Sequence, residues 1–73
     1  MDRKEIGGKL LKLRGTRPQR QVAAELGISQ NALSMYERGE RIPRDEIKLK
    51  LARYYGTTVQ EIFFTQNVHV LCT

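Results

Sequence analysis

The side chains with the clearest capacity for chemistry are three polar groups, Gln30, Asn31 and Ser34, which share the exposed face of a predicted helix. An amide donates and accepts hydrogen bonds at the same time, and a hydroxyl can do either. Such groups recognise a partner. The sequence offers no serine–histidine–aspartate set, carboxylate pair, phosphate-binding loop or metal-ligand cluster for catalysis. We therefore expect a binding protein that is not an enzyme and uses no cofactor.

Two short helices must present that polar face, and the stretch from Gln19 to Arg38 predicts them. Ala23 is small enough for two helix backbones to approach, and Gly27 supplies the positive backbone angle of a tight turn. Ser29 is a favourable N-cap for the second helix. Apolar residues anchor both helices on a core: Val22, Leu26, Ile28, Leu33 and Tyr36. Together these features predict a helix-turn-helix, whose second helix lies in the major groove of DNA.

A further helix is predicted before this motif, between Arg3 and Arg14. Its apolar residues recur at helical spacing: Ile6, Leu10 and Leu13. Gly7 and Gly8 each weaken it by about 1 kcal/mol relative to Ala, so it depends on tertiary packing. Gly15 is expected to end it in the left-handed region. Pro18 is expected to be the first residue of the next helix, where its missing N–H costs nothing.

Two more helices are predicted after the motif. Residues 41–44 form a turn, and the following helix carries Asp45 and Glu46 in its first turn, where they complement the helix dipole. One stripe of that helix is apolar: Ile47, Leu51, Ala52 and Tyr55. Gly56 ends it. Residues 58–61 form a capping-box pattern that begins a short fifth helix. Residues 1–64 are therefore expected to form one all-helical DNA-binding domain.

The bulk composition is compatible with a nucleic-acid partner. Among 73 residues, 13 Lys and Arg outweigh 8 Asp and Glu, which gives a formal net charge of +5. Basic domains bind polyanions because each neutralised phosphate releases counterions. The charged N-terminus lacks the apolar region of a signal peptide. No apolar stretch approaches the roughly 18 residues of a membrane helix, so we expect a cytoplasmic protein with no membrane partner.

The C-terminal residues 65–73 form a separate tail. Residues 68–71 are rich in β-formers and predict either an added strand, which could serve in dimerisation, or a frayed end. Cys72 is the single cysteine, so it cannot form an internal disulfide. With His69 it provides two candidate ligands, whereas structural zinc requires four. No metal site is predicted.

The chain resembles the Cro/CI-type helix-turn-helix domain, a family often named for the xenobiotic response element. The matching residues are Gln19, Val22, Ala23, Leu26 to Ser29, Leu33, Tyr36 to Gly39, Arg41, Pro43, Leu51, Ala52, Gly56, Val59 and Glu61 to Phe63. The resemblance spans about residues 6–63 and implies a five-helix, lambda-repressor-like bundle that binds double-stranded DNA. The link at 15–18 is about two residues shorter than usual in the family, and Pro18 replaces the usual Ser or Thr cap.

The resemblance also implies roles for individual residues. The base-reading positions fall on Gln30, Asn31, Ser34 and Met35. Gln and Asn suit this role because each amide can pair with adenine, and a methionine can contact a thymine methyl group. Gln19 is implied as a phosphate anchor, and Glu37 is implied to pair with Arg14. With the residues that flank the motif, the expected phosphate contacts are Gln19, Ser29, Arg17, Arg20, Arg38, Arg41 and Arg44.

These expectations define a transcriptional regulator that acts as a homodimer. One helix reads only a few base pairs, whereas two helices about 34 Å apart read a near-palindromic operator. We expect repression by occupancy because the sequence shows no effector domain and no activation surface. No small-molecule ligand is evident either. The alternative is an antitoxin or phage-type protein-interaction module on the same fold, with the apolar tail as its binding segment.

Overall fold

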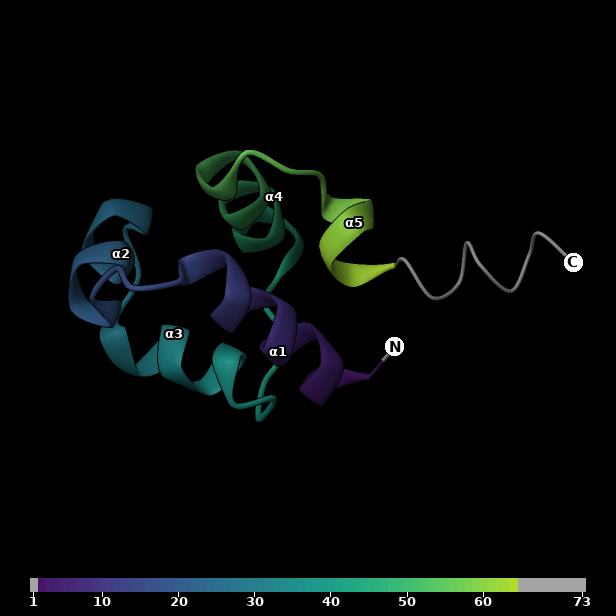
Figure 1. The fold of residues 1–73 in the computed structure, drawn as a ribbon, viewed down its shortest axis with the longest axis horizontal. Coiled ribbons are helices and arrows are strands. Elements are labelled where there is room, and N and C mark those ends of the chain that lie inside the picture. Colours follow the sequence, from purple (N-terminus) through teal and green to yellow (C-terminus); the bar gives the residue numbers. More distant parts are fainter. Residues whose placement is uncertain (1, 65–73) are drawn as a thin grey trace, which may run out of the picture.

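The computed structural model describes residues 2–64, and this part of the chain folds into five α-helices without a strand (Figure 1). The helices are α1 (Arg3–Arg14), α2 (Gln19–Leu26), α3 (Gln30–Glu37), α4 (Asp45–Tyr55) and α5 (Val59–Phe63). The predicted all-helical bundle is therefore confirmed. None of these helices is long and apolar enough to cross a membrane. The predicted tail, residues 65–73, lies outside the described residues.

Three predicted helix-end residues have the expected geometry, whereas Gly15, with φ 61° and ψ −128°, is not in the left-handed helical conformation predicted for it. Ser29 Oγ accepts the backbone N–H of Ala32 at 3.0 Å, and Thr58 Oγ1 accepts that of Glu61 at 3.0 Å. Both hydroxyls satisfy N–H groups that the helix itself cannot pair. Gly27 adopts the left-handed conformation with φ 75°, as the turn of a helix-turn-helix requires. The turn between α2 and α3 is thus fixed from both sides.

The prediction that Pro18 is the first residue of a helix was wrong by one position. Pro18 has an extended backbone, with ψ 138°, and serves as the N-cap of α2. Its carbonyl oxygen accepts the backbone N–H of Val22 at 3.1 Å, which is the first hydrogen bond of the helix. Proline cannot supply a side-chain cap, and α2 has none. Its first-turn N–H groups therefore lack a capping side chain.

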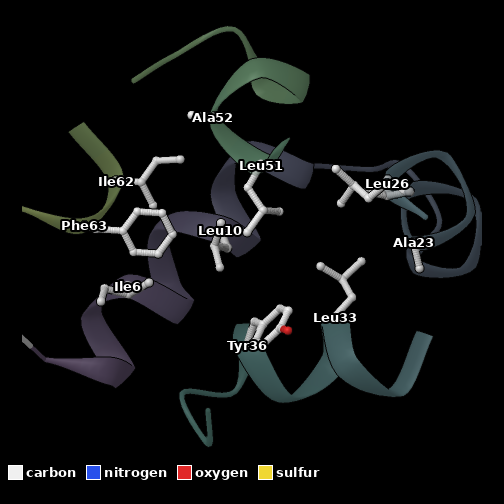
Figure 2. Packing of buried hydrophobic residues seen from close by; sticks show 11 residues of the cluster. Ile6, Leu10, Ala23, Leu26, Leu33, Tyr36, Leu51, Ala52, Ile62 and Phe63 are labelled. Atoms are coloured by element: carbon white, nitrogen blue, oxygen red, sulfur yellow. The ribbon is translucent and has the colours of Figure 1, made fainter. Parts of the chain in front are cut away.

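A single apolar core joins all five helices. Its fully buried side chains come from four helices, namely Leu10, Val22, Leu33 and Leu51, while Ile62 and Phe63 add the contribution of α5 (Figure 2). Leu33 and Tyr36 project from α3 into this core (Figure 2). Because these two residues bury one side of α3, the opposite side of the helix is left facing solvent.

The contact between α1 and α3 explains why α1 contains a glycine at its centre. A Cβ atom at Gly7 would lie 2.4 Å from the carbonyl oxygen of Glu37 and 2.9 Å from that of Tyr36. The two backbones therefore touch, and no side chain fits between them. Gly8, the next residue, has nothing within 4 Å of the same position. Gly7 thus sets the distance between α1 and α3, a role that helix propensity alone did not reveal.

Candidate nucleic-acid interface

The exposed side of α3 carries the polar residues that the sequence assigned to base reading. Gln30 and Asn31 are exposed, and Ser34 and Met35 are half-buried. An open hollow on the surface is lined by Gln30, Asn31 and Ser34, together with Gln19 of α2. The structure therefore brings Gln19 and the predicted base-reading amides into one polar surface. We call the four hollow-lining residues the α3 polar surface.

Side-chain hydrogen bonds hold two amides of this surface, Gln19 and Gln30, in place. Gln19 Nε2 donates to Glu37 Oε1 at 2.9 Å, and Gln30 Nε2 donates to Gln19 Oε1 at 3.3 Å. An amide nitrogen has two donors, so Gln19 and Gln30 each keep one N–H for another partner. Gln30 also keeps its oxygen as an acceptor. The side chain of Gln30 is therefore oriented by α2 while it retains the donor and acceptor needed to bind a base.

A buried ion pair lies beneath the α3 polar surface. Arg14 Nε and Glu37 Oε2 are 2.7 Å apart, and the two side chains are 18% and 2% exposed. The hydrogen bond to Glu37 raises the pKa of Arg14 above its usual value. Arg14 Nη1 also donates to the backbone oxygen of Arg17 at 2.7 Å. The predicted pairing of Arg14 with Glu37 is therefore present, despite the short link between α1 and α2.

Most of the predicted phosphate contacts lie in α2, at the caps of α3 or shortly after α3 along the chain. Ser29 caps α3, and its hydroxyl hydrogen remains able to donate. Arg20 is exposed in the first turn of α2, and Arg41 and Arg44 are exposed in the segment between α3 and α4. Arg38 Nη2 and Glu40 Oε1 form a solvent-exposed ion pair at 3.2 Å. Arg38, Arg41 and Arg44 thus follow the C-terminal end of α3 along the chain, and Arg20 is next to Gln19 in α2.

Arg17 takes a different position. Its guanidinium carbon lies 5.4 Å from the ring centroid of Tyr54 and 5.6 Å from that of Tyr55, close enough for cation–π attraction. The two rings meet edge to face, with centroids 5.1 Å apart. The structure therefore places Arg17 against the C-terminal end of α4 instead of on the α3 polar surface. Phosphate binding by Arg17 stays a prediction.

The sequence reasoning overlooked Arg3 and Lys4. Arg3 Nη1 donates to the backbone oxygen of Glu40 at 3.5 Å, although 37 positions separate the two residues. The only local signal was the glycine at position 39, one of the residues that carry the family resemblance. Contacts of this sequence separation depend on how α1 crosses α3, which helical periodicity does not specify.

Comparison with known proteins agrees with this geometry. The chain belongs to the Cro/CI-type helix-turn-helix family: the family model described as "Helix-turn-helix" matches residues 9–62. It is also similar to the cryptic phage CTXphi transcriptional repressor RstR of Vibrio cholerae, with 36% identity over 52 residues. That match covers 71% of this chain but 47% of RstR, so the chain spans about half the length of this relative. The comparison with solved structures found no significant match to the chain.

Proposed function

We propose that this protein is a transcriptional regulator that binds double-stranded DNA and reads base edges in the major groove with α3. The observation that carries this proposal is the α3 polar surface, in which Gln30 and Asn31 are exposed and Gln30 is oriented by Gln19. Gln30 keeps a free donor and a free acceptor, and Asn31 is an exposed amide of the same kind. Adenine offers the complementary pair in the major groove, an acceptor at N7 and a donor at N6. The α3 helix supplies these groups on a rigid element.

Phosphate contacts at both ends of α3 would fix its register on the duplex. At one end, α2 begins without a side-chain cap, so its first-turn N–H groups can bind a phosphate beside Gln19 and Arg20. At the other end, Arg38, Arg41 and Arg44 provide exposed positive charges. Contacts of this kind position a protein without reading sequence. Specificity is therefore assigned to Gln30, Asn31, Ser34 and Met35.

We further propose that the protein acts as a homodimer and as a cytoplasmic repressor. A helix of eight residues is about 12 Å long and reaches few base pairs, so a second copy is needed for a useful operator. We assign dimerisation to α5 and residues 68–71. The similarity to RstR, which is named a transcriptional repressor, favours repression over activation. The mechanism proposed is occupancy of a near-palindromic site, without catalysis or a cofactor.

Selection of duplexes from a random library tests DNA recognition and the shape of the site together. We expect enrichment of a near-palindromic sequence whose half-sites lie about one helical turn apart. A protein that retains all sequences equally would contradict sequence-specific binding. Enrichment of one short asymmetric half-site would contradict the homodimer while leaving base reading intact.

The stoichiometry of the complex provides the second test. Sedimentation of the protein with the selected duplex should give two chains per duplex. One chain per duplex at saturation would contradict the homodimer. A stoichiometric complex with a host protein that retains no DNA would instead favour an antitoxin or another protein-interaction module.

A further inference from the structure

We infer that Arg3 and Lys4, in the first turn of α1, bind DNA phosphates next to the segment that follows α3. This inference rests on the proposed function, because it extends the surface that would face the duplex. It adds two contacts that neither the helix-turn-helix motif nor the flanking arginines include. The pair would act with Arg38 and Arg41, and we call these four residues the α1–loop basic surface.

The backbone geometry places the start of α1 against the residues that follow α3 (Figure 1). A Cβ atom at Gly39 would lie 2.7 Å from the Cα of Lys4 and 3.0 Å from the backbone oxygen of Arg3. Gly39 has φ +74°, a conformation that suits glycine. Two independent features therefore require glycine at this position. The first turn of α1 is fixed at the C-terminal end of α3 by direct backbone contact.

The side chains at this junction remain able to reach a partner. Arg3, Lys4, Arg38 and Arg41 are all exposed. The hydrogen bond from Arg3 to the carbonyl oxygen of Glu40 directs its guanidinium along the loop and uses one of its five donors. The fixed backbone holds Arg3 and Lys4 beside the predicted contacts Arg38 and Arg41. The four cations are therefore carried by two segments whose backbones are in contact.

Two of the three acidic groups at this junction already have partners, and the third shares the first turn of α1 with Arg3 and Lys4. The Asp2 carboxylate accepts the backbone N–H of Lys4 at 3.0 Å and caps α1. Glu40 pairs with Arg38. Glu5 is exposed in the first turn of α1. A phosphate would compete with Glu40 for Arg38. Arg3 instead donates to a neutral carbonyl, so it can bind a phosphate without leaving a carboxylate unpaired.

The position of this surface relative to α3 explains what it would do. A helix in the major groove has a phosphate backbone near each of its ends. Gln19 contacts Gln30 at the start of α3 and Glu37 at its end, whereas the α1–loop basic surface lies beyond the C-terminal end of α3. Arg3 and Lys4 would therefore bind phosphates beyond the C-terminal end of α3. They would add affinity without base preference.

The salt dependence of binding tests this inference. The double variant Arg3→Gln/Lys4→Gln removes two charges while the backbone N–H of Lys4 still meets the Asp2 cap. Each phosphate contact contributes about 0.9 to the slope of log K against log salt, so two contacts are worth about sixtyfold in affinity at about 0.1 M salt. We expect the slope to fall by about 2 and affinity for the selected and a scrambled duplex to fall by the same factor.

Two further variants control for net charge and for folding. Lys12→Gln/Arg53→Gln removes the same charge from α1 and α4, where Lys12 and Arg53 line hollows that exclude α3. We expect the slope of this variant to stay within about 0.5 of wild type. The charge-conserving variant Arg3→Lys/Lys4→Arg should retain the wild-type slope. Circular dichroism should show the same thermal midpoint for all three.

The outcomes separate this inference from the proposed function. If Arg3→Gln/Lys4→Gln changes the slope no more than the control pair does, Arg3 and Lys4 are not phosphate contacts. If it weakens the selected duplex but not the scrambled one, these residues read sequence and the inference is also wrong. If wild-type protein does not distinguish the two duplexes at all, the proposed function fails, whatever the variants do.

Discussion

Replacement of Glu37 by glutamine should destabilise the fold far more than its small change in shape suggests. The side chain is 2% exposed, and its two oxygens accept Arg14 Nε at 2.7 Å and Gln19 Nε2 at 2.9 Å. A glutamine has one oxygen, so its NH₂ group must face one of these donors. Arg14, itself 18% exposed, then loses its counter-ion. Breaking a buried ion pair costs about 3–5 kcal/mol.

We expect the lower end of that range, about 3 kcal/mol, because Arg14 keeps some solvent and its bond to the Arg17 carbonyl. A domain of this size has only about 5 kcal/mol of total stability. Urea unfolding followed by far-ultraviolet circular dichroism measures the difference. Glu40→Gln is the matched control, since it removes the partner of Arg38 in an ion pair whose side chains are 56% and 54% exposed.

The control should lose less than about 0.5 kcal/mol, because solvent-exposed ion pairs contribute little. Equal losses in Glu37→Gln and Glu40→Gln would refute the reasoning, since burial would then not decide the value of the pair. A loss confined to DNA binding, with unchanged unfolding, would instead show that Glu37 positions Gln19 without stabilising the bundle.

Two other predictions concern stability. Gly7→Ala should lower the free energy of unfolding by about 3 kcal/mol, because its Cβ would meet backbone atoms. Gly8→Ala should raise it by about 0.5–1 kcal/mol, because the added Cβ lies in open space. Urea unfolding of both variants measures these changes, and equal effects would exclude a close crossing of α1 and α3. Burial raises the pKa of Tyr55 to about 12, against about 10 in an unfolded chain. As the pH rises, the unfolded state therefore releases the Tyr55 proton first. The stability that the protonated Tyr55 hydroxyl contributes is complete below about pH 10 and is lost as the pH rises towards about 12. Tyr55→Phe should reduce that decline in urea titrations at several pH values, and an unchanged decline would assign it to other groups.

The helix-turn-helix was predictable because its signals are local. Gly27 and Ser29 determine the turn between α2 and α3 through backbone conformation and a single cap, and both signals lie within a few residues of their effect. The polar face of α3 followed from the positions of Leu33 and Tyr36, which must be buried. The five helices could therefore be located from spacing, with an error of one residue at Pro18.

The features that escaped prediction depend on contacts between distant residues. Gly7 was interpreted as a weak point of α1, but its role is to admit the backbone of α3. Arg17 was grouped with the phosphate contacts because it lies near the start of α2, and the structure places it over the rings of Tyr54 and Tyr55. Periodicity identifies which face of a helix is buried, but not which atoms of another helix it meets.

Base reading by α3 is tested most directly by how well the protein discriminates the selected duplex from a scrambled one. The discrimination is measured for wild type and for Gln30→Ala/Asn31→Ala. The difference in binding free energy between the two duplexes should fall by about 2–6 kcal/mol in the double variant, while its unfolding curve stays unchanged. Gln21→Ala removes an amide on another face of α2, where it bonds to Glu25, and should keep the wild-type ratio. Full discrimination by the double variant would contradict the assignment of sequence reading to α3.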